Sequence, residues 1–139
     1  MCGFNKKRIK DQVLSIHQVQ ELINIGFDVR KYATSAVIEA KDGNHYIVDR
    51  RLLSINMGFM ETEVIEYFET LSIGDIMDIL PNVIKTTRFS YMIGIANPSV
   101  YYIDREISKG VYFFEKNFFI DNLFEALKWC IKNKHIQCQ

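Results

Sequence analysis

The stretch from Asn122 to Asn133 most constrains the fold, because it has the pattern of an amphipathic helix with its own start signal. Asn122 is placed to cap the helix, and Glu125 stands three residues later, which is the spacing of a capping box. At about 100° per residue, apolar side chains gather on one face. They are Leu123, Phe124, Ala126, Leu127, Cys130 and Ile131. Such a face must cover an apolar surface, so we expect this helix to pack on a sheet.

Two earlier stretches carry the same kind of signal. Ser15 and Gln18 have capping-box spacing, and Gly26 offers a left-handed stop, so a short helix is predicted between Ser15 and Gly26. Ser72 is placed to cap another helix, which Pro81 ends because proline cannot continue it. The chain is therefore expected to hold three helices.

The remaining ordered segments have the signals of antiparallel strands. The Asp42-Gly43 pair favours a tight turn, so a hairpin is predicted over 34–50. Further along, short apolar runs separated by turn residues predict a meander of strands over 89–96, 100–104 and 111–116. Since Val111–Phe114 is apolar at every position, both faces of that strand are expected to be at least partly covered.

These elements predict an α+β fold, in which an antiparallel sheet of hairpins carries three helices packed mainly on one face. Residues 51–70 have no clean period and fit either a helix or an extended segment, of which we favour the extended one. Residues 1–14 are polar and basic, which predicts a loosely ordered lead-in. No linker or repeat interrupts the chain, so residues 1–139 are expected to form one domain.

Composition narrows the class of protein. With 139 residues that are 48% hydrophobic, the chain can bury a sizeable core. Seventeen basic residues balance 17 acidic ones, so the basic excess typical of a phosphate-binding protein is missing. No stretch approaches the roughly 20 apolar residues of a membrane helix, and no signal peptide is recognised. Three cysteines do not suggest a disulfide framework, so we expect a cytoplasmic protein with no membrane contact.

Three segments together support a family resemblance. Residues 14–28, 71–81 and 122–136 resemble, in the same order, segments of a group of small uncharacterised proteins. These proteins occur in anaerobic gut bacteria and in their phages and mobile elements. The chain departs from the group at Asn133-Lys134, where the group ends its last helix with Asn-Gly. The resemblance implies a cytoplasmic protein encoded by a phage or mobile element, and it implies no activity, ligand or catalytic residue.

Residues with metal or catalytic chemistry are scattered along the chain. His17, His45 and His135 fall on separate predicted elements, which favours surface imidazoles. The spacing of Cys130, His135 and Cys138 is the nearest approach to a metal pattern, but a zinc site normally has four ligands and begins from a close cysteine pair. Cys130 also belongs to the apolar face of its helix. We therefore predict no catalytic residue, metal ligand or cofactor.

Paired carboxylates and phosphate-binding loops lead to the same conclusion. Asp75 and Asp78 are predicted on the solvent side of their helix, where they would have no acid–base role. The glycines stand singly, so neither a dinucleotide-binding nor a P-loop spacing occurs.

Aromatic and arginine side chains are the best candidates for an interaction surface. The chain has ten Phe and seven Tyr, and Tyr and Trp are enriched at protein interfaces. The candidate residues are Trp129, Tyr91, Tyr101, Tyr102, Arg88 and Arg105. The simpler alternative is that the tyrosines pack across strands and that Trp129 completes the core.

Three functional hypotheses follow. The first is a small non-enzymatic protein that binds a protein partner or another copy of itself, since a net charge of zero gives little repulsion between copies. The second is an accessory protein that binds nucleic acid through strand aromatics and arginines. The third is a small enzyme whose site is assembled from distant residues.

Overall fold

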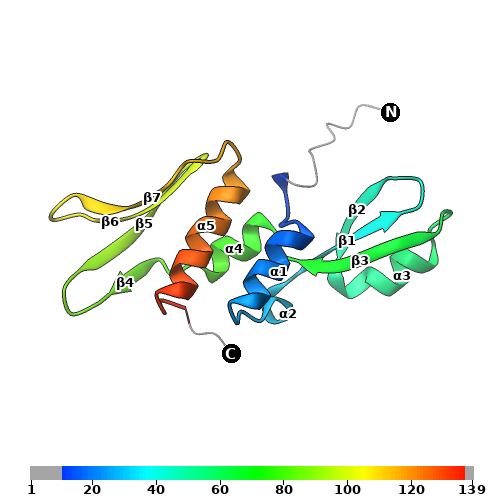
Figure 1. The fold of residues 1–139 in the computed structure, drawn as a ribbon, viewed down its shortest axis with the longest axis horizontal. Helices are drawn as coiled ribbons and strands as arrows, with labels where there is room; N and C mark the ends of the chain where they lie inside the picture. The colour runs from blue at the N-terminus through cyan, green and yellow to red at the C-terminus, as the bar shows by residue number, and fades with distance from the viewer. Residues whose placement is uncertain (1–10, 137–139) are drawn as a thin grey trace.

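The computed structural model describes residues 11–136, which form two antiparallel sheets with helices between them (Figure 1). The first sheet has the strand order β2-β1-β3, and its strands are β1 (Ser35–Ala40), β2 (His45–Asp49) and β3 (Val64–Thr70). The second has the order β4-β5-β6-β7, with β4 (Val83–Lys85), β5 (Ser90–Ala96), β6 (Ser99–Asp104) and β7 (Lys109–Phe113). The helices of the described part are α1 (Ile16–Asn24), α2 (Val29–Tyr32), α3 (Leu53–Gly58), α4 (Ile73–Ile79) and α5 (Phe119–Lys132), with a 3₁₀ turn η2 (Arg50–Leu52).

The α+β class and the antiparallel pairing are confirmed, but the strands form two sheets and not the single sheet that was predicted. β3 pairs with β1 and therefore belongs to the first sheet, although it is closer in sequence to the strands of the second sheet than β1 and β2 are. α4 then separates β3 from β4, and Pro81 follows the C-cap residue Leu80 of that helix. As a result α1, α4 and α5 lie between the two sheets (Figure 1). The prediction had placed three helices mainly on one face of a single sheet.

Residues 51–70 combine both alternatives that the sequence left open. The Asp49 carboxylate accepts a hydrogen bond of 2.8 Å from the Arg51 backbone N–H, which begins η2, and α3 follows directly. The side-chain hydrogen bond from Arg51 also lowers the pKa of Asp49 to about 2. β3 then occupies the second half of the segment, so the extended prediction is confirmed for β3 and wrong for η2 and α3.

The end of the expected lead-in is part of the packed structure. Val13 and Leu14 are buried, and the Leu14 N–H donates to the Leu71 carbonyl at 3.0 Å. The Thr70 hydroxyl donates to the Leu14 carbonyl at 2.7 Å. Apolar side chains at these two positions therefore anchor the chain where a loose segment was predicted, whereas residues 1–10 lie outside the described residues.

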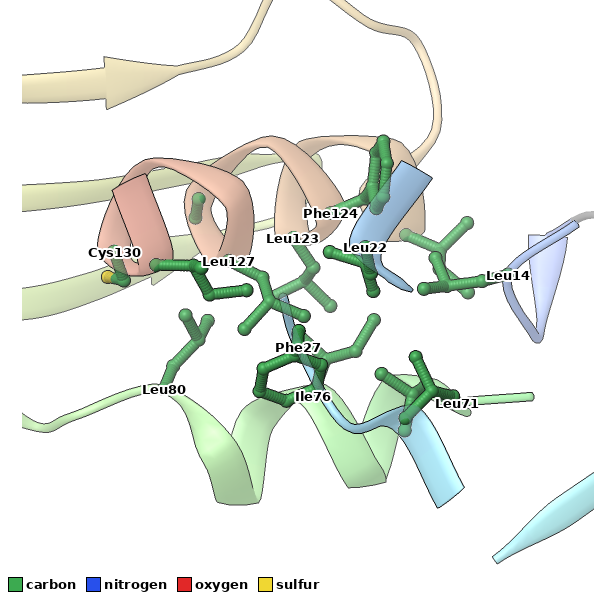
Figure 2. Packing of buried hydrophobic residues seen from close by; sticks show 14 of the residues in the cluster. Leu14, Leu22, Phe27, Leu71, Ile76, Leu80, Leu123, Phe124, Leu127 and Cys130 are labelled. Atoms are coloured by element: carbon green, nitrogen blue, oxygen red, sulfur yellow. The ribbon is translucent and has the colours of Figure 1, made fainter. Parts of the chain in front are cut away.

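The main core lies among α1, α4, α5 and the inner side of the second sheet. Figure 2 shows Leu22 and Phe27 packed against residues of α4 and α5 such as Ile76 and Leu127. Leu22, Ile76 and Leu127 are fully buried. Burying one such side chain stabilises the fold by about 1.5–3 kcal/mol relative to exposing it. The predicted apolar face of the last helix is confirmed, because all six of its residues are buried.

The start of α5 differs from the prediction. The helix begins at Phe119, so Asn122 lies inside it and does not cap it. Its side chain is 1% exposed and bonds to two loops. The amide N–H₂ group donates to the carbonyls of Pro98 at 2.7 Å and Lys116 at 3.1 Å, and the amide oxygen accepts from the Lys116 N–H at 3.3 Å. Asn122 thus holds both the β5–β6 turn and the segment after β7 against the helix.

The predicted capping box of Ser15 with Gln18 is present, and so is the predicted cap at Ser72, where Asp75 completes a capping box. Asp75 was expected on a solvated face but is buried, because its carboxylate also reaches the segment before β1. It accepts from the Thr34 hydroxyl at 2.7 Å and from the Thr34 N–H at 3.1 Å. One carboxylate therefore joins the start of α4 to the start of the first sheet.

Candidate protein-binding surfaces

The second sheet has one face that the helices leave open. Side chains alternate along each strand, so the burial of Ile84, Val100 and Tyr102 identifies the inner face, which packs on α5 and the main core. The opposite face, here called the outer face, consists of Val83, Lys85, Ser90, Met92, Gly94, Ala96, Ser99, Tyr101, Ile103, Gly110 and Tyr112, with Phe114 directly after β7.

The outer face is almost free of charge. Within strands β4–β7, Lys85 at one corner is the only charged residue that points outward. Several large apolar side chains are exposed there instead, among them Met92, Tyr112 and Phe114. An antiparallel sheet with one face in water usually alternates apolar and polar side chains. The outer face therefore has the composition of a covered surface although no part of the described chain covers it.

A row of aromatic rings crosses this face. Tyr101 stacks on its cross-strand partner Tyr112 with ring centroids 5.4 Å apart, and Tyr112 meets Phe114 edge to face at 6.4 Å. Gly94 makes room for the row, since a Cβ atom at that position would overlap the Tyr101 ring. The Tyr101 ring therefore lies directly over the backbone of Gly94.

A groove runs between β7 and α5 and is here called the β7–α5 groove. It encloses a cavity of about 430 Å³. Its strand side comprises Tyr112, Phe113, Phe114, Glu115 and Lys116, and its helix side Asn122, Glu125, Lys128, Trp129 and Lys132. Tyr112 points to the outer face and Phe113 to the inner face, so the cavity follows the edge of the strand.

Trp129 forms the aromatic wall of this groove and also closes the core. Its ring stacks on Tyr102 at 5.7 Å, meets Phe113 at 6.0 Å and lies 5.0 Å from the His135 ring. The side chain is half-buried. Trp129 therefore combines both roles considered for it, since one part of the ring packs inside and another borders the groove.

Charges on the helix side of the groove are partly paired. Lys128 bonds to Glu21 at 2.8 Å and to Glu125 at 3.1 Å. Burial lowers the pKa of Lys128, but the hydrogen bonds to both glutamates outweigh it and raise that pKa above its usual value. Lys128 therefore stays charged and serves to tie α5 to α1.

Of the predicted tyrosines, Tyr101 lies on the outer face, whereas Tyr102 is fully buried and cannot belong to an interaction surface. Neighbours on a strand point to opposite faces, and one face of this sheet is covered, so only one of the two tyrosines is exposed. The Tyr102 hydroxyl donates to the Pro81 carbonyl at 2.8 Å, and burial raises its pKa well above its usual range. Tyr91 is on the inner side and stacks on Phe89 at 4.2 Å.

Arg88 and Arg105 are exposed and lie in turns, not on the strands. Arg88 is in the β4–β5 turn and Arg105 in the β6–β7 turn, and both turns are at the same end of the sheet. The structure thus brings the two arginines toward one end but separates them from the row of rings, which crosses the outer face.

The residues considered for metal or catalytic chemistry do not converge in the described structure. Among residues 11–136, no group of three or more His, Cys, Asp or Glu side chains could hold a metal ion. Cys130 is buried, and burial raises its pKa to about 11, which keeps the thiol protonated. His135 packs on Trp129, His45 lies 3.7 Å from Glu39, and Cys138 is outside the described residues.

A second hollow of about 760 Å³ lies between α1 and β3. Ile16 and Ile23 of α1 are exposed along it together with Tyr67. Within residues 11–136 no helix is long and apolar enough to cross a membrane.

Met92, Tyr112 and Phe114 were missed as surface candidates from sequence. For Tyr112 and Phe114 the signal was the apolar run Val111–Phe114, which was interpreted as at least partial coverage of both faces of that strand. Comparisons of the chain with protein-family models, curated proteins and solved structures found no match.

Proposed function

We propose that this is a non-enzymatic protein that acts by protein–protein contact through the outer face, with a second copy of the chain as its first partner. The observation that carries the proposal is the open, uncharged and aromatic outer face. Aromatic residues and Met are enriched in the buried centres of interfaces, where charged residues are depleted.

Self-association fits this surface because a face on which Lys85 is the one charged strand residue opposes few like charges when two copies meet about a two-fold axis. The net charge of zero adds little long-range repulsion. Four strands about 4.8 Å apart and three to seven residues long make a face of roughly 350 Å². This is about half of the 800 Å² that each partner buries in a standard interface, so we expect a weak dimer.

The test is sedimentation velocity over a concentration series from about 1 μM to 1 mM, a range that brackets weak association. The mass should rise toward that of a dimer, and Tyr112→Lys should remain a monomer because its charge would be buried. Tyr67→Lys is the matched control, since Tyr67 is 55% exposed and Tyr112 45%, but Tyr67 lies on the first sheet. A monomer throughout, or equal dimers in both variants, would contradict self-association through this face.

The proposal retains the expected cytoplasmic location and the phage or mobile-element origin. The buried free thiol of Cys130 is compatible with a reducing compartment. Sequencing the neighbouring genes tests the origin, and a set of ordinary housekeeping neighbours would speak against it.

Nucleic-acid binding is the second candidate, because Arg88 and Arg105 lie at one end of the sheet together with Lys85 and Lys109. Asp104 and Glu106 in the same turn region offset part of this charge. Binding of a labelled single strand at low salt tests it. Affinity that Arg88→Ala with Arg105→Ala leaves unchanged would eliminate this site.

A further inference from the structure

We infer that the β7–α5 groove is a second binding site, which takes an extended acidic segment of another protein as an additional strand beside β7. This site adjoins the outer face, with which it shares Tyr112 and Phe114, but binding there does not require self-association. The inference rests on the edge position of β7, on the shape of the groove and on its charge.

β7 is an edge strand, since β6 is its only neighbour in the described sheet. On such a strand every second residue directs its backbone N–H and C=O away from the sheet, where they can pair with a further strand. Proteins usually protect edges with charged residues, proline, bulges or short length. Beyond Lys109 at its first position, β7 is Gly110-Val-Tyr-Phe113, which has neither charge nor proline.

The other edge of the same sheet shows the contrast. β4 has only three residues, ends with Lys85 and begins two residues after Pro81. That edge is short and charged, so it offers little to an added strand. Of the two edges of the second sheet, β7 is therefore the one that is open to pairing with a further strand.

The groove beside β7 has the form that strand addition needs. Its cavity of about 430 Å³ follows the strand edge, and α5 forms its second wall. A segment paired with β7 would alternate its side chains between the outer face and the Phe113–Trp129 contact. Backbone pairing would supply affinity, and the aromatic wall would select one set of side chains.

Charge defines the chemistry of the occupant. The charged residues that line the groove are Glu115, Lys116, Glu125, Lys128 and Lys132. Glu125 and Lys128 pair with each other, and Lys128 also pairs with Glu21. Of the remaining charged residues in the lining, Lys116 and Lys132 are positive and Glu115 is negative. The groove therefore favours a segment with acidic residues over a basic one.

The test begins with a random library of peptides of about twelve residues displayed on phage, long enough to span β7 at about 3.4 Å per residue. Selection against the whole chain should enrich peptides that alternate apolar residues and carry Asp or Glu. Trp129 is the sole tryptophan of the chain, so its fluorescence reports occupation of the groove directly. Enriched peptides should shift Trp129 emission with a saturable dependence on concentration.

Two sets of variants make the result specific. Lys116→Glu with Lys132→Glu should weaken peptide binding at least about tenfold, whereas the charge reversal Lys41→Glu in the turn between β1 and β2 should not. Methylation of peptide backbone nitrogens should abolish binding at alternate positions only, because a strand directs every second N–H toward β7.

The inference is overturned by selection that yields no acidic alternating peptides, by binding without a change in Trp129 emission, or by equal sensitivity to methylation at every position. Dimer formation through the outer face is measured separately by sedimentation of the chain without peptide. The groove variants at Lys116 and Lys132 lie outside the outer face, so failure of peptide binding can be distinguished from failure of self-association.

Discussion

Replacement of Asn122 tests how the second sheet is held on α5. The side chain is 1% exposed and makes three hydrogen bonds, two to carbonyls and one to an N–H. Asn122→Ala removes all three and leaves the backbone groups of Pro98 and Lys116 without these partners. At about 0.5–1.5 kcal/mol per hydrogen bond, the free energy of unfolding should fall by about 2–4 kcal/mol. Urea denaturation followed by circular dichroism measures this change.

Asn122→Asp keeps the size of the side chain but replaces the donating group with a carboxylate oxygen that faces two carbonyls. Burial and these oxygens should raise the pKa of the new carboxyl group above its unfolded value of about 3.9. The folded state then binds the proton more tightly than the unfolded state, so stability falls as pH rises above about 4. We expect the variant to be at least as unstable as Asn122→Ala at pH 7 and to recover part of the loss near pH 4, relative to the unmodified chain.

Asn133→Ala is the matched control, because Asn133 bonds to the Trp129 carbonyl at 2.9 Å on the exposed end of the same helix. Its cost should stay within about 0.5 kcal/mol. The reasoning is refuted if Asn122→Ala is equally mild, or if Asn122→Asp follows the same pH dependence as the unmodified chain.

Three further predictions concern the core and the close approaches in the second sheet. Leu127→Ala should lower the free energy of unfolding by about 2–5 kcal/mol, because the side chain is fully buried; a loss below about 0.5 kcal/mol would contradict the core assignment. Gly94→Ala should lower the free energy of unfolding by about 1 kcal/mol, since the Tyr101 ring above it can turn aside. Gly110→Ala should lower it by about 2 kcal/mol or more, since its Cβ would overlap the Tyr102 backbone carbonyl. Equal losses in the two variants would count against this distinction. With the other cysteines replaced by serine, Cys130 should react with a thiol reagent at pH 8 at least about 100-fold more slowly in the folded than in the unfolded chain, because its pKa is raised from 9.0 to about 11.

Local signals predicted those parts of the fold that depend on neighbouring residues. The Asp42-Gly43 pair joins β1 to β2, and both short helices begin at their predicted serine caps. These features succeed because a turn or a cap is decided by contacts within about four residues.

The division into two sheets depends on contacts that no local pattern contains. β3 pairs with β1, with Thr70 opposite Ser35, although β2, η2 and α3 separate the two strands in the sequence. At Asn122 a good capping residue was drawn into long-range hydrogen bonds, and the helix began earlier in the chain. At Asn122, tertiary contacts outweighed a local capping preference.

The candidate surface was only half predictable for a similar reason. Alternation shows that Tyr101 and Tyr102 point to opposite sides, but not which side a helix covers. That choice depends on the position of α5, where Trp129 stacks on Tyr102. Once Tyr102 is inside, Tyr101 and Tyr112 are necessarily outside, and the row of rings follows.

The Asp75 carboxylate affects the order in which the parts of the molecule unfold. The buried residues of β1 (Ala36, Val37, Ile38 and Ala40) do not belong to the main core cluster, so the first sheet has its own packing. The hydrogen bonds from Thr34 to Asp75 are among the contacts that connect this sheet to α4. Loss of that carboxylate would uncouple two cooperative units, and amide exchange in β1 would then accelerate while α5 kept its protection.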